Sequence, residues 1–128
     1  MDALVATGFG CFRVDLEDGD SELTDDDPPA AQQVEVSLPL VVAAAQVGSR
    51  VVAVVDRRPP LLLSDDAGLT WREVGGGLPA GVAIAVDESD PDTMIYASES
   101  RLFLSGDGGL FWHSLPTELI GITAVAFS

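Results

Sequence analysis

Two similar stretches of the sequence decide the fold. They read LSDDAGLTW at residues 63–71 and LSGDGGLFW at residues 104–112. Their serines, Ser64 and Ser105, are 41 residues apart, and so are their tryptophans, Trp71 and Trp112. A period of about 40 residues is long enough for one unit of four short antiparallel strands. The spacing therefore predicts a chain built from repeated four-stranded sheets.

Short apolar segments recur in the same order around both stretches. Each segment is rich in Val, Leu, Ile or Ala and is bounded by Gly, Pro, Asp or Ser, which is typical of β-strands. No segment has a sustained helical period, so we predict an all-β fold. The predicted strands are 41–45, 50–55, 61–63 and one from Thr70 in the first repeat, and 82–86, 94–98, 102–104 and one from Phe111 in the second; Leu-Pro closes the repeats at 78–79 and 115–116.

The two ends of the chain supply a third repeat. Residues 122–127 resemble a first strand with nothing after it, and residues 3–7 resemble a second strand with nothing before it. Residues 10–14 fit the third strand and residues 33–36 the fourth, with Leu-Pro at 38–39. The predicted units are therefore a split one made of residues 122–128 and 1–39, a second over residues 40–79 and a third over residues 80–119.

The two quoted stretches resemble the Asp-box (BNR) repeat, S-x-D-x-G-x-T-W, of a β-propeller family that includes sialidases, sortilin-type receptors and photosystem assembly factors. The resemblance implies four-stranded propeller blades, three in this chain. It also implies that the box is a structural turn between a third and a fourth strand. The matching residues are Ser64, Asp66, Gly68, Thr70 and Trp71 in the first copy and Ser105, Asp107, Gly109 and Trp112 in the second, where Phe111 replaces the usual threonine.

Three blades are too few for a closed ring, because propellers have about four to eight. Two chains would give six, and two-fold dimers are the commonest oligomers. We therefore expect a six-bladed homodimer in which strand 122–127 of one chain joins residues 3–14 of the other. The alternative is that the chain is a piece of a longer propeller.

The charge and the cysteine content exclude several classes of function. The net charge is −15, there is no lysine, and all six basic residues are arginine. Such a chain is repelled by nucleic acids and by anionic membranes. Cys11 is the single cysteine, so no disulfide within the chain and no Cys-pair metal site is expected. No leader peptide or membrane span is apparent, and we expect a cytoplasmic protein without a cofactor or metal.

The acidic segment 16–31 lies where a third Asp box is expected. Eight of the 21 acidic residues fall between Asp15 and Asp27, ahead of two prolines. Like charges in a short span repel each other, so we expect a mobile loop on the outer face, which would recruit a basic protein if it recruits anything. A calcium loop is the alternative, although the ligand spacing of an EF-hand is missing.

Candidate ligand-binding residues are few. Arg57 and Arg58 precede two prolines in a loop between a second and a third strand, and Arg101 follows the equivalent loop. This is the face where propellers commonly bind ligands, and clustered arginines bind carboxylates or phosphates. A solvated turn is the alternative interpretation.

No catalytic arrangement is recognisable. The related sialidases use three arginines, a tyrosine with a glutamate partner, and an aspartate, whereas Tyr96 here is expected in the core and His113 at the surface. We therefore expect a non-catalytic propeller that acts as a binding or scaffold module for a small ligand or protein. The alternative is a glycan-active propeller, either a hydrolase or a lectin. A channel mouth lined by small residues would favour the first interpretation, and one with arginines, carboxylates and exposed aromatic residues the second.

Overall fold

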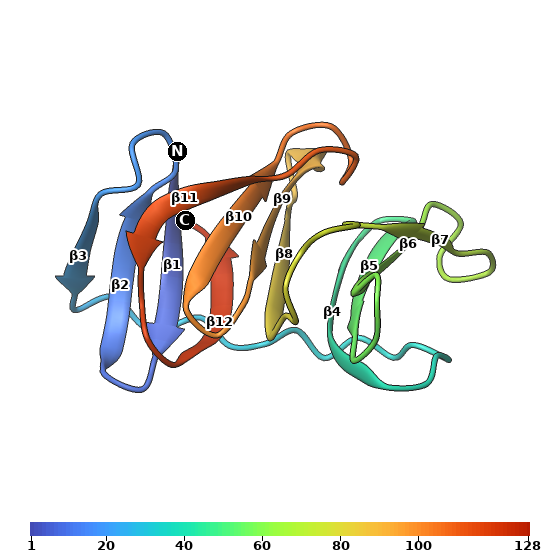
Figure 1. The fold of residues 1–128 in the computed structure, drawn as a ribbon, viewed down its shortest axis with the longest axis horizontal. Coiled ribbons are helices and arrows are strands. Elements are labelled where there is room, and N and C mark those ends of the chain that lie inside the picture. Colours follow the sequence, from blue (N-terminus) through green and yellow to red (C-terminus); the bar gives the residue numbers. More distant parts are fainter.

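The computed structural model describes the whole chain, residues 1–128, as twelve β-strands. In Figure 1 strands β1–β3 lie at one end of the molecule and β4–β7 at the other, with β8–β10 between them. No helix that could span a membrane is present in the structure. In chain order the strands are β1 (Asp2–Thr7), β2 (Gly10–Asp15), β3 (Ser21–Thr24), β4 (Val41–Val47), β5 (Arg50–Val55), β6 (Leu61–Ser64), β7 (Arg72–Val74), β8 (Ala83–Asp87), β9 (Asp90–Ala97), β10 (Arg101–Ser105), β11 (His113–Glu118) and β12 (Ile122–Phe127).

The strands form three antiparallel sheets of four strands each. The split sheet has the order β12-β1-β2-β3, the first-box sheet β4-β5-β6-β7 and the second-box sheet β8-β9-β10-β11. In the two box sheets each strand pairs with its neighbour in sequence. The expected all-β fold of three four-stranded antiparallel units is confirmed.

The second-box sheet lies between the other two sheets. Its innermost strand, β8, is in contact with β4 on one side and with β12 on the other. One apolar cluster, which includes Val5 and Ile95, fills the space between the second-box sheet and the split sheet. A second cluster, which includes Val52 and Tyr96, fills the space between the second-box and first-box sheets. Apolar residues on both faces are typical of sheets that are stacked on both sides.

The split sheet joins the two ends of the chain. Strand β12 pairs with β1 from Ala3↔Phe127 to Thr7↔Ile122. In this structure the pairing is made within one chain, whereas sequence reasoning placed it between two chains. The connection that allows this is the strap, residues 25–40, which runs from β3 past the second-box sheet to β4 (Figure 1).

The fourth strand of the split sheet is β3, and the prediction of residues 33–36 was wrong. The cause is a tight turn after β2, in which Asp15 N donates to Asp20 O at 2.8 Å. Gly19 lies in this turn with φ +79°, a conformation that glycine adopts without strain. The turn sends the chain back onto β2 at once, so Val14 pairs with Ser21.

The acidic segment is also more regular than expected. Leu16 is buried in the cluster that the split sheet shares with the second-box sheet. The turn is packed closely, because a Cβ on Gly19 would lie 2.6 Å from Pro116 Cδ. The prediction of a loop over residues 16–31 was therefore wrong for its first half, which forms a packed turn and a strand.

The prediction that a Leu-Pro pair follows the last strand of each repeat is correct for one of the two box sheets. Leu78 and Pro79 follow β7, as expected, whereas Leu115 and Pro116 lie inside β11. A proline is tolerated there because β11 is the edge strand, where an N–H on the outer side needs no partner.

Candidate functional site

The first box turn, residues 64–71, is held by its own side chains. Ser64 Oγ donates to Asp66 Oδ1 at 2.7 Å and accepts from Gly68 N at 2.8 Å. Asp66 in turn accepts from Thr70 N at 2.8 Å and from Thr70 Oγ1 at 2.5 Å. Gly68 has φ +93°, which an L side chain rarely adopts. These bonds fix the turn between β6 and β7.

The hydrogen bonds to Asp66 change its acidity. The bonds from the Thr70 hydroxyl, the Thr70 amide and Ser64 hold the pKa of Asp66 at about 2, below its ordinary value of 3.8. A carboxylate this acidic is a poor proton donor near neutral pH. Both carboxylate oxygens of Asp66 accept hydrogen bonds from residues of the same turn. This agrees with the turn-forming role that the resemblance implies.

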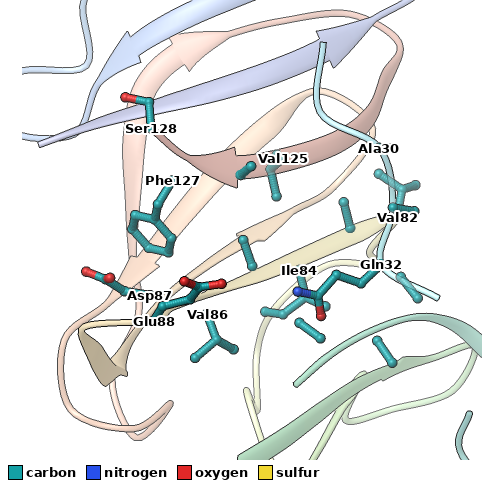
Figure 2. Close-up of a pocket in the computed structure, with 17 residues that line it drawn as sticks. Ala30, Gln32, Val82, Ile84, Val86, Asp87, Glu88, Val125, Phe127 and Ser128 are labelled. Carbon is teal, nitrogen blue, oxygen red and sulfur yellow. The ribbon is translucent and has the colours of Figure 1, made fainter. Parts of the chain in front are cut away.

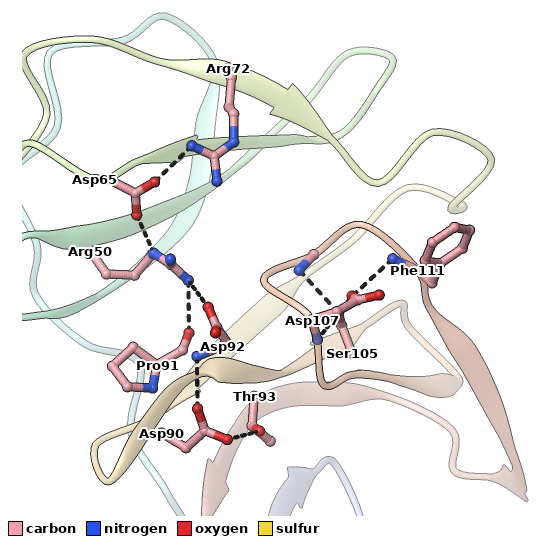
Figure 3. Close-up of polar contacts among 11 residues, drawn as sticks. Arg50, Asp65, Arg72, Asp90, Pro91, Asp92, Thr93, Ser105, Asp107 and Phe111 are labelled. Atoms are coloured by element: carbon pink, nitrogen blue, oxygen red, sulfur yellow. Dashed lines mark hydrogen bonds and ion pairs between the residues drawn. The ribbon is translucent and has the colours of Figure 1, made fainter.

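The second box turn, residues 105–112, repeats the pattern without the bond from a threonine hydroxyl. Ser105 Oγ donates to Asp107 Oδ1 at 2.9 Å and accepts from Gly109 N at 3.0 Å. Asp107 accepts from the amide of Phe111 at 3.0 Å, but Phe111 has no hydroxyl to offer (Figure 3). The bond from this amide lowers the pKa of Asp107. Trp112 Nε1 donates to Gly109 O at 2.9 Å, so the indole ring closes the turn.

A guanidinium group connects the two box sheets. Arg50, at the start of β5, donates to Pro91 O at 2.9 Å and to Asp92 Oδ1 at 3.3 Å, both on β9 (Figure 3). Its Nε also donates to Asp65 Oδ1 at 2.5 Å. Arg72 bonds the other oxygen of Asp65 at 2.7 Å, and the two arginines, Arg72 first, lower the pKa of that carboxyl. The arrangement ties neighbouring sheets together and leaves little of Arg50 free for a ligand.

A mostly apolar pocket of 380 Å³ lies on the side where the inner strands β4, β8 and β12 meet. Figure 2 shows β8 and β12 forming two of its walls, with the strap along one side. The strap is held there by a hydrogen bond from Gln46 N on β4 to Gln32 Oε1 at 2.9 Å. Of its 17 lining residues 13 are hydrophobic, and the lining residues are Ala30, Ala31, Gln32, Ala43, Ala44, Ala45, Val82, Ala83, Ile84, Ala85, Val86, Asp87, Glu88, Val125, Ala126, Phe127 and Ser128.

The charged side chains of this pocket gather at one end. The carboxylates of Asp87 and Glu88 lie beside the ring of Phe127 (Figure 2). Asp87 Oδ1 is fixed by the amide and hydroxyl of Ser89, at 3.0 and 2.9 Å. No arginine, lysine or histidine lines the pocket, and neither carboxylate takes part in an ion pair of this structure. The pocket is therefore mostly apolar and is negatively charged at one end.

A search of solved structures gives the context for this geometry. The chain is similar in fold to a GH74 enzyme from Niastella koreensis, with a TM-score of 0.53 and 20% sequence identity. GH74 is a β-propeller family. The chain has a propeller-type fold. The match covers 96% of this chain but 19% of that enzyme, and at this identity it shows the fold alone.

Comparisons based on sequence give no match. No protein-family model matches the chain, and no curated protein does. The assignment of residues to a site therefore depends on the geometry of this chain, in which the three sheets are propeller blades and β4, β8 and β12 are their inner strands.

The three arginines proposed for the ligand face do not form one site. Arg57 and Arg58 line a small pocket of 120 Å³ together with Leu78 and Gly81. Arg101 lies apart from it, with its Nη2 3.8 Å from Glu118 Oε2 on the neighbouring strand. No ligand geometry common to the three arginines is present.

Other reactive side chains are used structurally. Tyr96 is buried, and its hydroxyl donates to Pro79 O at 2.7 Å. Burial raises the pKa of Tyr96 to about 12. Burial also raises the pKa of the Cys11 thiol, and His113 is exposed on β11. No three His, Cys, Asp or Glu side chains are placed so that they could hold a metal ion, and Asp15 accepts hydrogen bonds from the amides of its own turn.

Sequence reasoning missed the acidic end of the concave pocket. Asp87 and Glu88 follow the predicted first strand of the third unit, and Phe127 ends the matching strand at the C-terminus. A signal was available, because first strands lie innermost in a blade and their ends meet at one mouth of the channel. The strap residues Ala30 and Gln32 could not have been found in this way, since Ala30 was predicted to lie in a loop on the outer face and Gln32 was assigned to no element.

Proposed function

We propose that this chain is a non-catalytic propeller module of the Asp-box type, which binds a ligand in the concave pocket between its inner strands. The observation that carries the proposal is the composition of that pocket. Small-molecule sites are concave and mostly apolar, with a few placed polar groups, and have volumes of about 300–1,000 Å³. A pocket of 380 Å³ with 13 hydrophobic residues among 17 fits that description.

The Asp-box assignment is supported by the hydrogen bonds of the two turns. In both turns the serine hydroxyl accepts from the glycine amide four residues later, and the aspartate accepts from the amide at the usual threonine position. These bonds satisfy backbone donors in a tight turn. They give the box aspartates a structural role, and we propose no catalytic role for them.

We further propose that two chains close a six-bladed ring. The second-box sheet has a neighbour on each side, whereas the first-box and split sheets each have one. Ring closure would place the open side of the first-box sheet against a split sheet to which the second chain contributes. The strap has 16 residues, an extended reach of about 53–58 Å at about 3.3–3.6 Å per residue. That length would also allow the split sheet to be exchanged between chains.

The alternative is a glycan-active propeller, and the fold of the GH74 enzyme is what suggests it. A sialidase-like site would need arginines near the substrate, and none lines the concave pocket. A paired-carboxylate hydrolase acting in this pocket would have to use Asp87 and Glu88, the two acidic residues that line it. Function does not follow from fold alone. We therefore favour binding over hydrolysis because the pocket is mostly apolar and no arginine lines it.

The test combines a binding assay with an activity assay. Titration of isotope-labelled protein with a set of small organic fragments should shift resonances of Ala43, Ala44 and Ile84. Ala43→Phe should abolish these shifts by filling the pocket, whereas Val42→Phe, at the neighbouring half-exposed position outside the lining, should retain them.

The activity arm uses chromogenic glycosides. We expect no hydrolysis above the rate in buffer. Turnover that disappears in Asp87→Asn or Glu88→Gln would contradict the proposal and favour the glycan-active alternative. Fragments that shift no pocket resonance at millimolar concentration would also contradict it.

A further inference from the structure

The acidic end of the concave pocket has no counter-charge within the chain. Four of the six arginines, at positions 13, 50, 72 and 101, form ion pairs elsewhere. The other two, Arg57 and Arg58, line a different pocket. The carboxylates of Asp87 and Glu88 are therefore free to interact with a charged group that enters from solvent.

The carboxylate of Asp87 is fixed in place. Both the amide and the hydroxyl of Ser89 donate to its Oδ1, while no protein group donates to its Oδ2. Glu88, the next residue, lies on the same side of the pocket end (Figure 2). A fixed carboxylate loses little side-chain entropy when a cation binds.

An aromatic ring also lies at this end of the pocket. The ring of Phe127, on β12, lies between β12 and the two carboxylates of the β8 end (Figure 2). The face of an aromatic ring attracts cations, and aromatic rings are the usual recognition element for quaternary ammonium groups. Two carboxylates and an aromatic ring therefore lie together at this end of the pocket.

The remainder of the pocket suits an apolar group. Ala43, Ala44 and Ala45 on β4 and Ala83 and Ala85 on β8 leave space because their side chains are short. An inorganic cation would gain nothing from this lining and would need more oxygen ligands than two carboxylates on one side provide. An anion would be repelled by both carboxylates.

We propose that the pocket binds a small organic cation, with an ammonium group at Asp87, Glu88 and Phe127 and its alkyl groups along the alanine-lined walls. The inference rests on the proposed function, since it names the ligand class of the same pocket. It differs from attraction to the overall charge of −15, because it locates the preference at three side chains.

The test uses two probes of the same shape. Choline carries a trimethylammonium group, and 3,3-dimethylbutan-1-ol carries a neutral tert-butyl group in its place. We expect choline to shift the pocket resonances in a saturable manner and to bind at least about fivefold more tightly than the alcohol, the factor for about 1 kcal/mol of cation–π and charge attraction.

Variants assign the preference to the proposed residues. Glu88→Gln and Phe127→Leu should each weaken choline binding by about threefold or more and leave the alcohol unchanged. The matched control is Glu73→Gln, which removes the same charge from an exposed residue of β7 outside the pocket, and it should change neither titration.

The possible contrary results separate failure of this inference from failure of the proposed binding function. Equal binding of the two probes at the pocket would overturn the inference and leave the proposed binding function standing. An equal loss of choline binding in Glu73→Gln and Glu88→Gln would also overturn it, because the attraction would then come from the net charge. Absence of any shift with either probe would overturn it as well, and the fragment titration would then decide the proposed function.

Discussion

The two box turns share their serine and aspartate hydrogen bonds but differ in what surrounds them. Trp112 packs against the apolar cluster between the two box sheets, with its ring centroid 6.0 Å from that of Tyr96 in an edge-on arrangement. Trp71, its equivalent in the first turn, belongs to neither apolar cluster. The first-box sheet has no neighbour on that side within the chain. The comparison indicates that the box tryptophan acts between blades, and that Trp71 marks the side at which a further blade would pack.

The largest expected effect separates the two tryptophans. Trp112→Ala should destabilise the chain by about 3–5 kcal/mol, the range for large aromatic truncations in cores. Trp71→Ala should instead dissociate the proposed dimer, because its partner surface would lie on a sheet that the second chain completes. Denaturant unfolding and light scattering at one concentration measure the two effects. If Trp71→Ala leaves the mass of the dimer in solution unchanged, Trp71 does not act at the contact between chains, and the proposed difference between the two tryptophans is wrong.

The next largest effect on stability is expected from the hydroxyl of Tyr96, which lies in the second-box sheet. Tyr96→Phe removes the 2.7 Å hydrogen bond to Pro79 O while keeping the ring beside Trp112 and Phe103. We expect a loss of about 1–2 kcal/mol, because the carbonyl loses its partner. Urea unfolding measures it, and Phe103→Leu is a control for loss of aromatic packing alone. An unchanged midpoint for Tyr96→Phe would show that water replaces the hydroxyl.

A smaller effect is expected from exchanging the residue that differs between the turns. Phe111 is exposed and its side chain makes no hydrogen bond, whereas Thr70 Oγ1 donates to Asp66. Phe111→Thr should therefore add the missing bond to Asp107, lower the pKa of that carboxyl further and raise the melting temperature slightly. Phe111→Val is the matched control without a hydroxyl. Carbon-detected NMR titration measures the pKa, and an equal change in both variants would contradict the account.

The smallest effect is a dependence on pH. The pKa of Asp66 is about 2 in the folded chain, below its ordinary value of 3.8, so the folded state binds this proton more weakly than the unfolded chain does. The carboxylate therefore stabilises the fold above about pH 4, and this contribution is lost as the pH falls toward 2. Thr70→Val should raise the pKa of Asp66 toward its ordinary value, so the loss of stability at low pH should become smaller and be complete at a higher pH. Thermal unfolding between pH 5 and 2 in both proteins tests this expectation.

Most of the fold could be predicted from the sequence because each repeat contains residues that mark where its strands begin and end. The serine-aspartate-glycine pattern and the tryptophans gave the register of eight strands, and the apolar ends of the chain gave β1, β2 and β12. The fourth strand of the split sheet was missed because β3, Ser21–Thr24, is short and polar and has no box before it. Its position depends on the turn at Gly19 and on pairing with β2, neither of which a pattern of apolar residues reveals.

The candidate site was predicted less well than the fold. The arginines 57, 58 and 101 were chosen for their charge and loop position, but they are not brought together. The pocket is made by alanines and valines on three inner strands that are far apart in sequence, and by a strap whose path is set by tertiary contacts. Small apolar residues are read from sequence as core, so a cavity between them is visible only once the sheets are placed side by side.

The mass of the protein in solution tests most directly whether the open side at Trp71 is covered by a second chain. The account predicts a homodimer with twice the chain mass of 13.3 kDa, measured by light scattering at micromolar concentration and stable on dilution to the nanomolar range. Deleting residues 122–128 removes β12 and should abolish this species, since it takes one strand from each split sheet. A compact, folded species of 13.3 kDa that persists at all concentrations would contradict the six-bladed ring.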